Sequence, residues 1–267
     1  GEQMDLSDGL PYADSKMTIK AGEYEECGDA DIVVITAGAA QKPGQTRLEL
    51  VGINARITKD VATQVKNSGF KGILVVASNP VDIMTYVAYK ASGLPKEHVI
   101  GTGTLLDSAR MKRAVADRLH VDPRSVAGYN LGEHGNSQFT AWSTVKVLDQ
   151  PITKLAKERG LDLDELDKEA KMGGWTVFQG KKYTSYGVAT AAVRLVNVIL
   201  SNALTELPVS NYRDEYGVYL SYPAVVGRDG IVAQSHLDLT DEELAKLQTS
   251  ANFIKEKYAE SLDATKK

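Results

Sequence analysis

The apolar positions in the first part of the chain follow two kinds of pattern. Short β-branched apolar runs without polar alternation occupy residues 31–36, 72–78 and 99–102. Such runs are typical of strands that are buried on both faces of a sheet. Residues 46–68 and 81–92 instead space their apolar positions by about 3.6 residues, which predicts helices. Strands alternating with helices favour a parallel sheet with helices on both faces.

After residue 102 the pattern changes. Helices are predicted over residues 105–119, 162–178 and 185–204, and a last one follows the capping box that begins at Thr240. Strands are predicted over 125–131, 139–148, 216–226 and 230–237, and turn residues join the last two as a hairpin. We therefore divide the chain into an α/β part, residues 1–102, and an α+β part, residues 103–267.

The composition narrows the class of protein without indicating an activity. The chain has 267 residues and a net charge of −4, so nothing in it suggests a nucleic-acid partner or an anionic membrane surface. Cys27 is the single cysteine, which excludes an internal disulfide and a multi-cysteine metal site, and we expect no metal. The sequence shows neither an apolar run of membrane-spanning length nor a secretory signal. We expect a cytoplasmic protein.

The segment Gly-Glu-His-Gly at residues 132–135 holds the strongest candidate for chemistry. The chain has four histidines, and only His134 lies between glycines beside a carboxylate. An imidazole is well matched to proton transfer near neutral pH. A surface histidine in a glycine-rich turn is the alternative, and the neighbouring candidates Asp107 and Arg110 favour the functional interpretation.

Small or amide residues follow each of the three predicted parallel strands. Gly38 and Ala39 follow the first strand, Asn79 the second, and Thr102 ends the third. Ligands of open α/β sheets bind beyond the carboxyl ends of the strands. Gly38 alone is explained by turn formation, and Asn79 also suits a helix cap. Together, the three strand ends favour a binding site.

Two further features have both an ordinary and a functional explanation. Asp107 and Arg110 stand three residues apart on the predicted helix 105–119, where a solvated ion pair would contribute less than about 1 kcal/mol. The polar loop 39–47 contains Gly and Pro, and its length suits either a plain connector or a mobile lid.

Taken in order, these motifs resemble the L-lactate dehydrogenase family of NAD-dependent L-2-hydroxyacid dehydrogenases, which includes malate dehydrogenases. The matching segments are Thr-Ala-Gly-Ala at 36–39, the loop 41–47, Ser-Asn-Pro-Val-Asp at 78–82, Leu-Asp-Ser-Ala-Arg at 106–110, Gly-Glu-His-Gly at 132–135 and Tyr-Thr-Ser-Tyr-Gly at 183–187. The resemblance implies a Rossmann-type sheet followed by an α+β catalytic domain. The first strand–helix–strand unit of such a sheet, roughly 30 or more residues, is absent from this chain. The resemblance also implies NAD as cofactor, a small 2-keto or 2-hydroxy acid as substrate, and a homo-oligomer, either dimer or tetramer.

The resemblance implies a role for each catalytic candidate. His134 would donate and accept the proton, and Asp107 would fix its tautomer and stabilise the imidazolium. Arg110 would hold the substrate carboxylate by a two-pronged contact, which suits a planar guanidinium. Arg47 would polarise the substrate carbonyl, and Asn79 would bond its oxygen.

Other positions would shape the pocket and the cofactor site. Thr184 would line the pocket. Gln41 is neutral, whereas malate enzymes place an arginine there to pair a second carboxylate. Gly173 and Gly174 replace two residues that are usually alanines in bacterial lactate dehydrogenases, and this replacement would widen the pocket. In this respect the chain is similar to the L-2-hydroxyisocaproate dehydrogenase branch. The residues expected to approach the cofactor are Gly38, Ala39, Ala77, Asn79 and Thr102.

The expected function is NAD-dependent interconversion of pyruvate, or a bulkier 2-keto acid such as 2-ketoisocaproate, with the L-2-hydroxy acid. Two alternatives remain open on the sequence. One is a malate dehydrogenase, against which Gln41 argues. The other is a catalytically dead nucleotide-binding relative, which the missing glycine-rich phosphate-binding turn would suggest.

Overall fold

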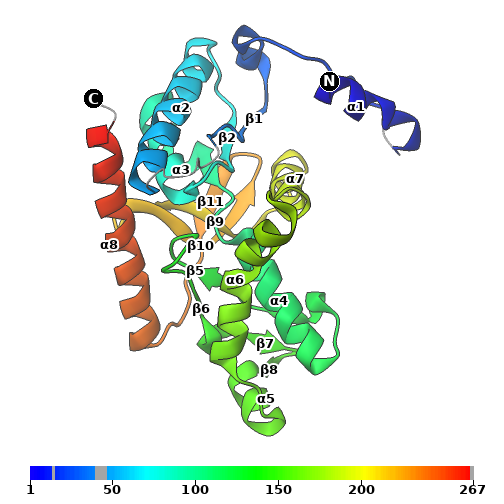
Figure 1. The fold of residues 1–267 in the computed structure, drawn as a ribbon, viewed down its shortest axis with the longest axis vertical. Helices are drawn as coiled ribbons and strands as arrows, with labels where there is room; N and C mark the ends of the chain where they lie inside the picture. The colour runs from blue at the N-terminus through cyan, green and yellow to red at the C-terminus, as the bar shows by residue number, and fades with distance from the viewer. Residues whose placement is uncertain (14–15, 40–46, 265–267) are drawn as a thin grey trace.

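The computed structural model describes residues 1–13, 16–39 and 47–264, without the side chains of 47, 48 and 262–264 (Figure 1). Its centre is a six-stranded sheet of order β1-β2-β3-β9-β10-β11. Strands β1 (Ile32–Ile35), β2 (Ile73–Val76) and β3 (Val99–Gly101) are parallel, as the sequence predicts. Strand β9 (Thr205–Arg213) pairs antiparallel with β3, and β10 (Val218–Gly227) and β11 (Gly230–Gln234) follow.

Helices cover both faces of this sheet. The side chains of β2 point alternately to the two faces, and both faces are buried, so every position of the strand is apolar. Leu74 and Val76 pack against α2 (Arg47–Asn67), α3 (Val81–Ser92) and α8 (Asp241–Ala264). Ile73 and Val75 pack on the other face against α7 (Tyr186–Leu200). Burial of both side-chain sets is the arrangement that a strand without polar alternation favours.

The middle of the chain forms a separate small core below the sheet in Figure 1. Its helices are α4 (Leu105–Leu119), α5 (Ile152–Arg159) and α6 (Leu163–Lys181). Short strands β4 (Val126–Ala127), β7 (Lys146–Val147) and β8 (Gln150–Pro151) form one small sheet, and β5 (Asn130–Leu131) pairs with β6 (Phe139–Thr140). The shorter elements of the whole chain are α1 (Glu2–Asp8) and the 3₁₀ helices Leu10–Tyr12, Tyr24–Asp29, Lys96–His98, Pro123–Ser125 and Trp142–Thr144.

Three local predictions were wrong. The strands predicted at 125–131 and 139–148 are each divided into short pieces, the first at Gly128, whose φ of 125° interrupts a strand. The helix predicted to reach residue 204 ends at Leu200. Strand β9 was not predicted, because Pro208, Ser210 and Asn211 are uncommon inside strands. In the structure Asn211 is satisfied by donating its side-chain amide to the carbonyl oxygens of Val209 and Tyr222.

The start of the described chain lies apart from the body. Helix α1 extends beyond the sheet in Figure 1, and its Met4 and Leu6 side chains are exposed. No helix in the described residues is both long and apolar enough to cross a membrane.

Candidate active site

The sequence candidates converge on a cavity of about 680 Å³ next to the carboxyl ends of β1 and β2. Its walls come from the loops after those strands, from α2, α4 and α6, and from the segment after β5. The lining residues are Ala39, Leu50, Val51, Asn54, Asn79, Pro80, Asp107, Arg110, Glu133, His134, Gly135, Asn136, Gln138, Lys171, Met172, Gly174 and Trp175.

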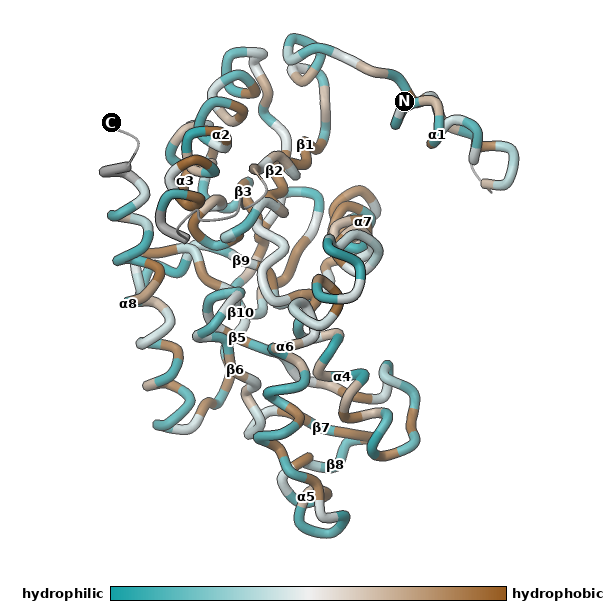
Figure 2. Tube along the Cα trace, in the orientation of Figure 1, coloured by the Kyte–Doolittle hydropathy of each residue, from teal (hydrophilic) through white to brown (hydrophobic). Residues whose placement is uncertain are grey.

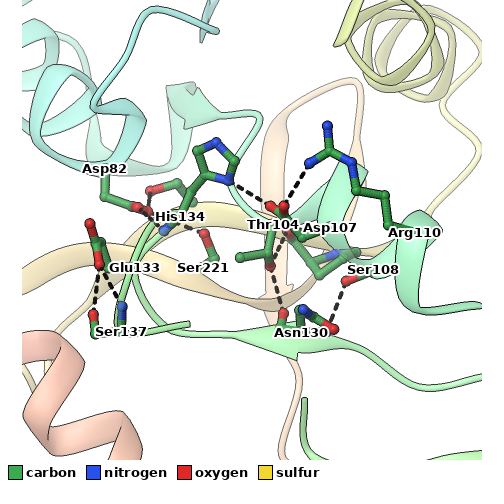
Figure 3. A network of polar contacts seen from close by, with 12 residues as sticks. Asp82, Thr104, Asp107, Ser108, Arg110, Asn130, Glu133, His134, Ser137 and Ser221 are labelled. Atoms are coloured by element: carbon green, nitrogen blue, oxygen red, sulfur yellow. Dashed lines mark hydrogen bonds and ion pairs between the residues drawn. The ribbon is translucent and has the colours of Figure 1, made fainter. Parts of the chain in front are cut away.

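Asp107 joins His134 and Arg110 in this cavity (Figure 3). Its Oδ2 lies 2.6 Å from Nδ1 of His134, and its Oδ1 accepts a hydrogen bond of 2.9 Å from Nη1 of Arg110. The Asp107 side chain is 1% exposed, and that of Arg110 is 15% exposed. The solvated ion pair that the sequence left open is therefore a buried one, held on the first turns of α4.

The charges in this group set its protonation. Burial alone would lower the pKa of His134, but the charge and hydrogen bond of Asp107 outweigh burial and raise that pKa to about 9. Burial would raise the pKa of Asp107, yet His134 and Arg110 together hold it below its usual value. Near neutral pH the site thus contains an ionised carboxylate and an imidazolium that can give up a proton.

The histidine loop is held by its neighbours as well as by its own sequence. Gly132 has a φ of 92°, and it exchanges two backbone hydrogen bonds of 2.9 Å with Ser221 of β10. The backbone N–H of Glu133 donates to Oγ of Ser250 on α8, and the Glu133 carboxylate accepts from the backbone N–H and hydroxyl of Ser137. A side chain at position 132 would collide with Ser250, whose Oγ would be 2.6 Å from an ideal Cβ.

Asn54 joins the loops that follow the first two strands, and the sequence analysis missed it. Its Oδ1 accepts from the backbone N–H of Ala39 at 2.8 Å, and its Nδ2 donates to the carbonyl oxygen of Asn79 at 2.9 Å. The side chain is 5% exposed. One signal was available, because Asn54 follows Leu50 by four residues and so lies on the apolar stripe of α2, where a polar residue needs partners.

The remaining predicted site residues differ in their distance from the cavity. Ala39 and Asn79 line the cavity with His134 and Arg110. Ala77 and Thr102 lie at the ends of β2 and β3 outside the lining, where their backbone N–H groups donate to Ile35 and Val76. Gly38 lies beside Asn54, and Thr184 is exposed between α6 and α7. Gln41 and the side chain of Arg47 are outside the described residues, so their roles stay predictions.

Helix α6 packs against Arg110 at two glycines. An ideal Cβ on Gly173 would lie 2.8 Å from Cδ of Arg110, whereas one on Gly174 would lie 3.5 Å from its Nη1. The space beside Gly173 is therefore filled by the guanidinium-bearing side chain. The same helix contributes Lys171 and Trp175 to the lining, which the sequence analysis did not single out.

The lining also contains the residue types that a nicotinamide ring would contact. Ala39, Val51 and Pro80 form an apolar wall, Asn79 adds an amide, and His134 lies within the same lining. The two hydrogen bonds of Asn54 hold the backbones of Ala39 and Asn79 at this wall.

Comparison with known proteins shows the family of the chain. The family model described as the lactate/malate dehydrogenase NAD-binding domain matches residues 1–101, and the lactate/malate dehydrogenase alpha/beta C-terminal domain matches residues 104–265. The chain belongs to the lactate/malate dehydrogenase family. The resemblance and the fold class expected from the sequence are thereby confirmed, and the protein is an NAD-dependent oxidoreductase that acts on a CH–OH group.

Similar proteins of this family cover most of the chain. It is 44% identical to an L-lactate dehydrogenase of Lactococcus lactis subsp. cremoris, over 96% of this chain and 84% of that protein. It is 45% identical to L-lactate dehydrogenase 2 of Enterococcus faecalis, over 97% of this chain and 84% of that protein. The crystal structure of the minor L-lactate dehydrogenase from Enterococcus mundtii in its ligand-bound form is 42% identical, with a TM-score of 0.94 over 97% of this chain and 85% of that one.

Proposed function

We propose that the protein interconverts pyruvate, or a bulkier 2-keto acid such as 2-ketoisocaproate, with the corresponding L-2-hydroxy acid, using NAD. One observation carries this proposal: a single buried carboxylate, Asp107, bonds both a proton donor, His134, and a cation, Arg110, at one cavity. A 2-keto acid needs these two groups side by side, because its carboxylate and its carbonyl are adjacent. The names of the L-lactate dehydrogenase relatives support the same substrate class.

The described residues account for substrate binding and proton transfer. Arg110 has five N–H donors, and while one is bonded to Asp107 others can bind the substrate carboxylate in two-pronged form. His134, fixed at Nδ1 by Asp107, can give the proton on Nε2 to the carbonyl oxygen during reduction and take it back during oxidation. When bound, NAD supplies the hydride chemistry. Asn79 is proposed to bond the reacting oxygen, as is Arg47.

A dicarboxylate substrate is less well supported. Among the described residues, the cavity lining includes one basic side chain besides Arg110 and His134, which is Lys171. Lys171 pairs with Asp167 at 3.1 Å, so its charge is already compensated. A second substrate carboxylate would lose hydration without gaining an unpaired cation from these described residues. The proposal is therefore a monocarboxylate enzyme rather than a malate dehydrogenase.

The test is steady-state NADH oxidation by the full-length protein with pyruvate, 2-ketobutyrate, 2-ketoisocaproate and oxaloacetate. We expect turnover of the first three and a much lower kcat/KM for oxaloacetate. His134→Ala should lose most turnover and still bind NADH, as measured by the change in NADH fluorescence. A wild-type protein that binds NADH but reduces none of these acids would refute the proposed substrate class.

We further propose that the protein is a cytoplasmic homo-oligomer, either dimer or tetramer. Helices α6 and α7 expose large apolar side chains, including Phe178, Val193 and Leu200, and the apolar colouring of α7 is visible in Figure 2. Exposed apolar surface of this kind is typical of protein interfaces. Sedimentation velocity of the full-length protein measures the subunit number, and a monomer at micromolar concentration would contradict the assembly.

A further inference from the structure

Asp82 is a buried carboxylate that reaches the histidine loop from the side opposite Asp107 (Figure 3). It lies in the first turn of α3 and is 1% exposed. Its Oδ2 accepts the backbone N–H of His134 at 2.7 Å. Its Oδ1 accepts hydrogen bonds from two serine hydroxyl groups, that of Ser210 on β9 at 2.6 Å and that of Ser221 on β10 at 3.2 Å. One carboxylate therefore ties α3 and two sheet strands to the residue that transfers the proton.

Fold stability alone does not require a charge at this position. Among the described residues Asp82 has no ion-pair partner, and its three hydrogen-bond donors are neutral. Burying a carboxylate without a cation is unfavourable, and a neutral asparagine could form the same number of hydrogen bonds. The N-terminal position in α3 offsets only part of this cost through the helix dipole.

We propose that Asp82 is a positioning residue for proton transfer: it holds the backbone of His134 in place and, as a second buried negative charge beside the ring, favours the imidazolium form. This inference rests on the proposed function and specifies how its acid–base site is held. Asp107 then orients the ring from α4, and Asp82 fixes the main chain that carries the ring from α3. Loss of either contact would move the Nε2 proton relative to the substrate oxygen.

The charged groups around Asp82 determine when it can act. Burial, with a smaller contribution from the Glu133 charge, raises the pKa of Asp82 to about 6. The hydrogen bonds from Ser210 and from the His134 backbone, and the His134 charge, oppose this rise. In return, the Asp82 charge adds to that of Asp107 in raising the pKa of His134, whereas Arg110 lowers it. Asp82 is thus ionised at neutral pH and becomes protonated as the pH falls through about 6.

The main test is Asp82→Asn. The amide oxygen can still accept the His134 N–H while the amide nitrogen donates to Ser210, so the variant removes the charge and keeps the connections. We expect kcat for keto-acid reduction to fall about tenfold or more and KM to stay within about twofold, because Arg110 is untouched. The midpoint of the alkaline loss of activity should move down by about half a unit or more, since a neighbouring negative charge has gone.

Glu243→Gln is the matched control. Glu243 is also a buried carboxylate, at 7% exposed, and accepts from a serine hydroxyl and from backbone N–H groups of Ser143 and Thr240. It does not line the cavity. We expect this variant to lose stability without any shift of the alkaline midpoint. If Asp82→Asn has the wild-type midpoint, or behaves as Glu243→Gln does, Asp82 is only structural and the inference is wrong.

Two further measurements keep the inference testable if Asp82→Asn does not fold or no keto acid is turned over. Ser210→Ala removes a hydrogen bond that lowers the pKa of Asp82, so the acid-side midpoint of kcat should move toward neutral pH, and an unchanged acid limb would overturn the inference. The ring of His134 can also be titrated directly by NMR. A lower His134 pKa in Asp82→Asn supports the inference without any substrate, whereas an equal pKa refutes it. Absence of turnover in the wild type would refute only the proposed substrate class.

Discussion

Replacing Gly173 by alanine should impair substrate binding through Arg110, and replacing its neighbour Gly174 should not. The added Cβ would lie 2.8 Å from Cδ and 3.1 Å from Nε of Arg110. Carbon atoms in favourable contact are about 3.5–4.0 Å apart, so the arginine stem must move by roughly 0.7 Å or more. At Gly174 the new methyl would be 3.5 Å from Nη1, which is ordinary contact.

The size of the effect follows from what Arg110 contributes. A hydrogen bond to a charged group stabilises by about 1.5–3 kcal/mol, and misplacement by about 1 Å can cost about a hundredfold in rate. Partial loss of one prong of the carboxylate contact should therefore lower kcat/KM by about 10- to 100-fold, or about 1.4–2.7 kcal/mol. Most of the loss should appear in KM, because Arg110 binds the part of the substrate that does not react.

The assay compares the two variants with pyruvate and with 2-ketoisocaproate, alongside thermal unfolding. Gly174→Ala should be as stable as wild type or more so, since alanine favours a helix over glycine by about 1 kcal/mol. In Gly173→Ala the strain of displacing Arg110 offsets that gain. Displacement of Arg110 predicts an equal loss for both acids in Gly173→Ala. If the two glycines only enlarge the pocket, each alanine should harm the branched acid more than pyruvate. A KM within twofold of wild type in Gly173→Ala, or an equal loss in Gly174→Ala, would refute the reasoning.

Four further predictions concern the proton, the pH dependence of stability, the loops and the substrate anchor. Because the pKa of His134 is raised to about 9, keto-acid reduction should fall and hydroxy-acid oxidation should rise as the pH increases through about 9. Asp107→Asn should move the midpoints of both pH–rate profiles toward the ordinary histidine pKa of about 6.5. Profiles that do not move would contradict the pairing of His134 with Asp107. The same raised pKa favours the folded state at pH values below about 6.5, and denaturant titrations should show this contribution disappearing as the pH rises through about 9. Asn54→Ala should lower the free energy of unfolding by about 1–3 kcal/mol and raise the KM for NADH. Gln64→Ala, which removes an exposed hydrogen bond to Asp60 on the same helix, should change neither. Arg110→Lys should raise the KM for pyruvate at least tenfold, since an ammonium cannot form the two-pronged contact, and an unchanged KM would remove Arg110 as the anchor.

The local sequence pattern was sufficient to predict much of the fold and to identify the expected acid–base group. The apolar run of β2 predicted a strand buried on both faces, and the apolar spacing of α2 predicted a long helix, because these signals depend only on neighbours along the chain. The motifs around Asp107, Arg110 and His134 likewise indicated one site, since each motif carries its chemistry within a few residues. The identity of the expected family followed from their order.

Only the tertiary structure decided which distant groups meet. Strand β9 forms although its sequence disfavours a strand, because Gly101 and the partner strand β10 supply its hydrogen bonds. Gly173 looked like added space until the structure placed Arg110 against it. Asn54 and Asp82 reach the site through bonds to segments 15 to 139 residues away, which is the basis of the role proposed for Asp82. The physical reason is that a buried polar group is stabilised by partners that packing brings to it, and no local pattern names those partners.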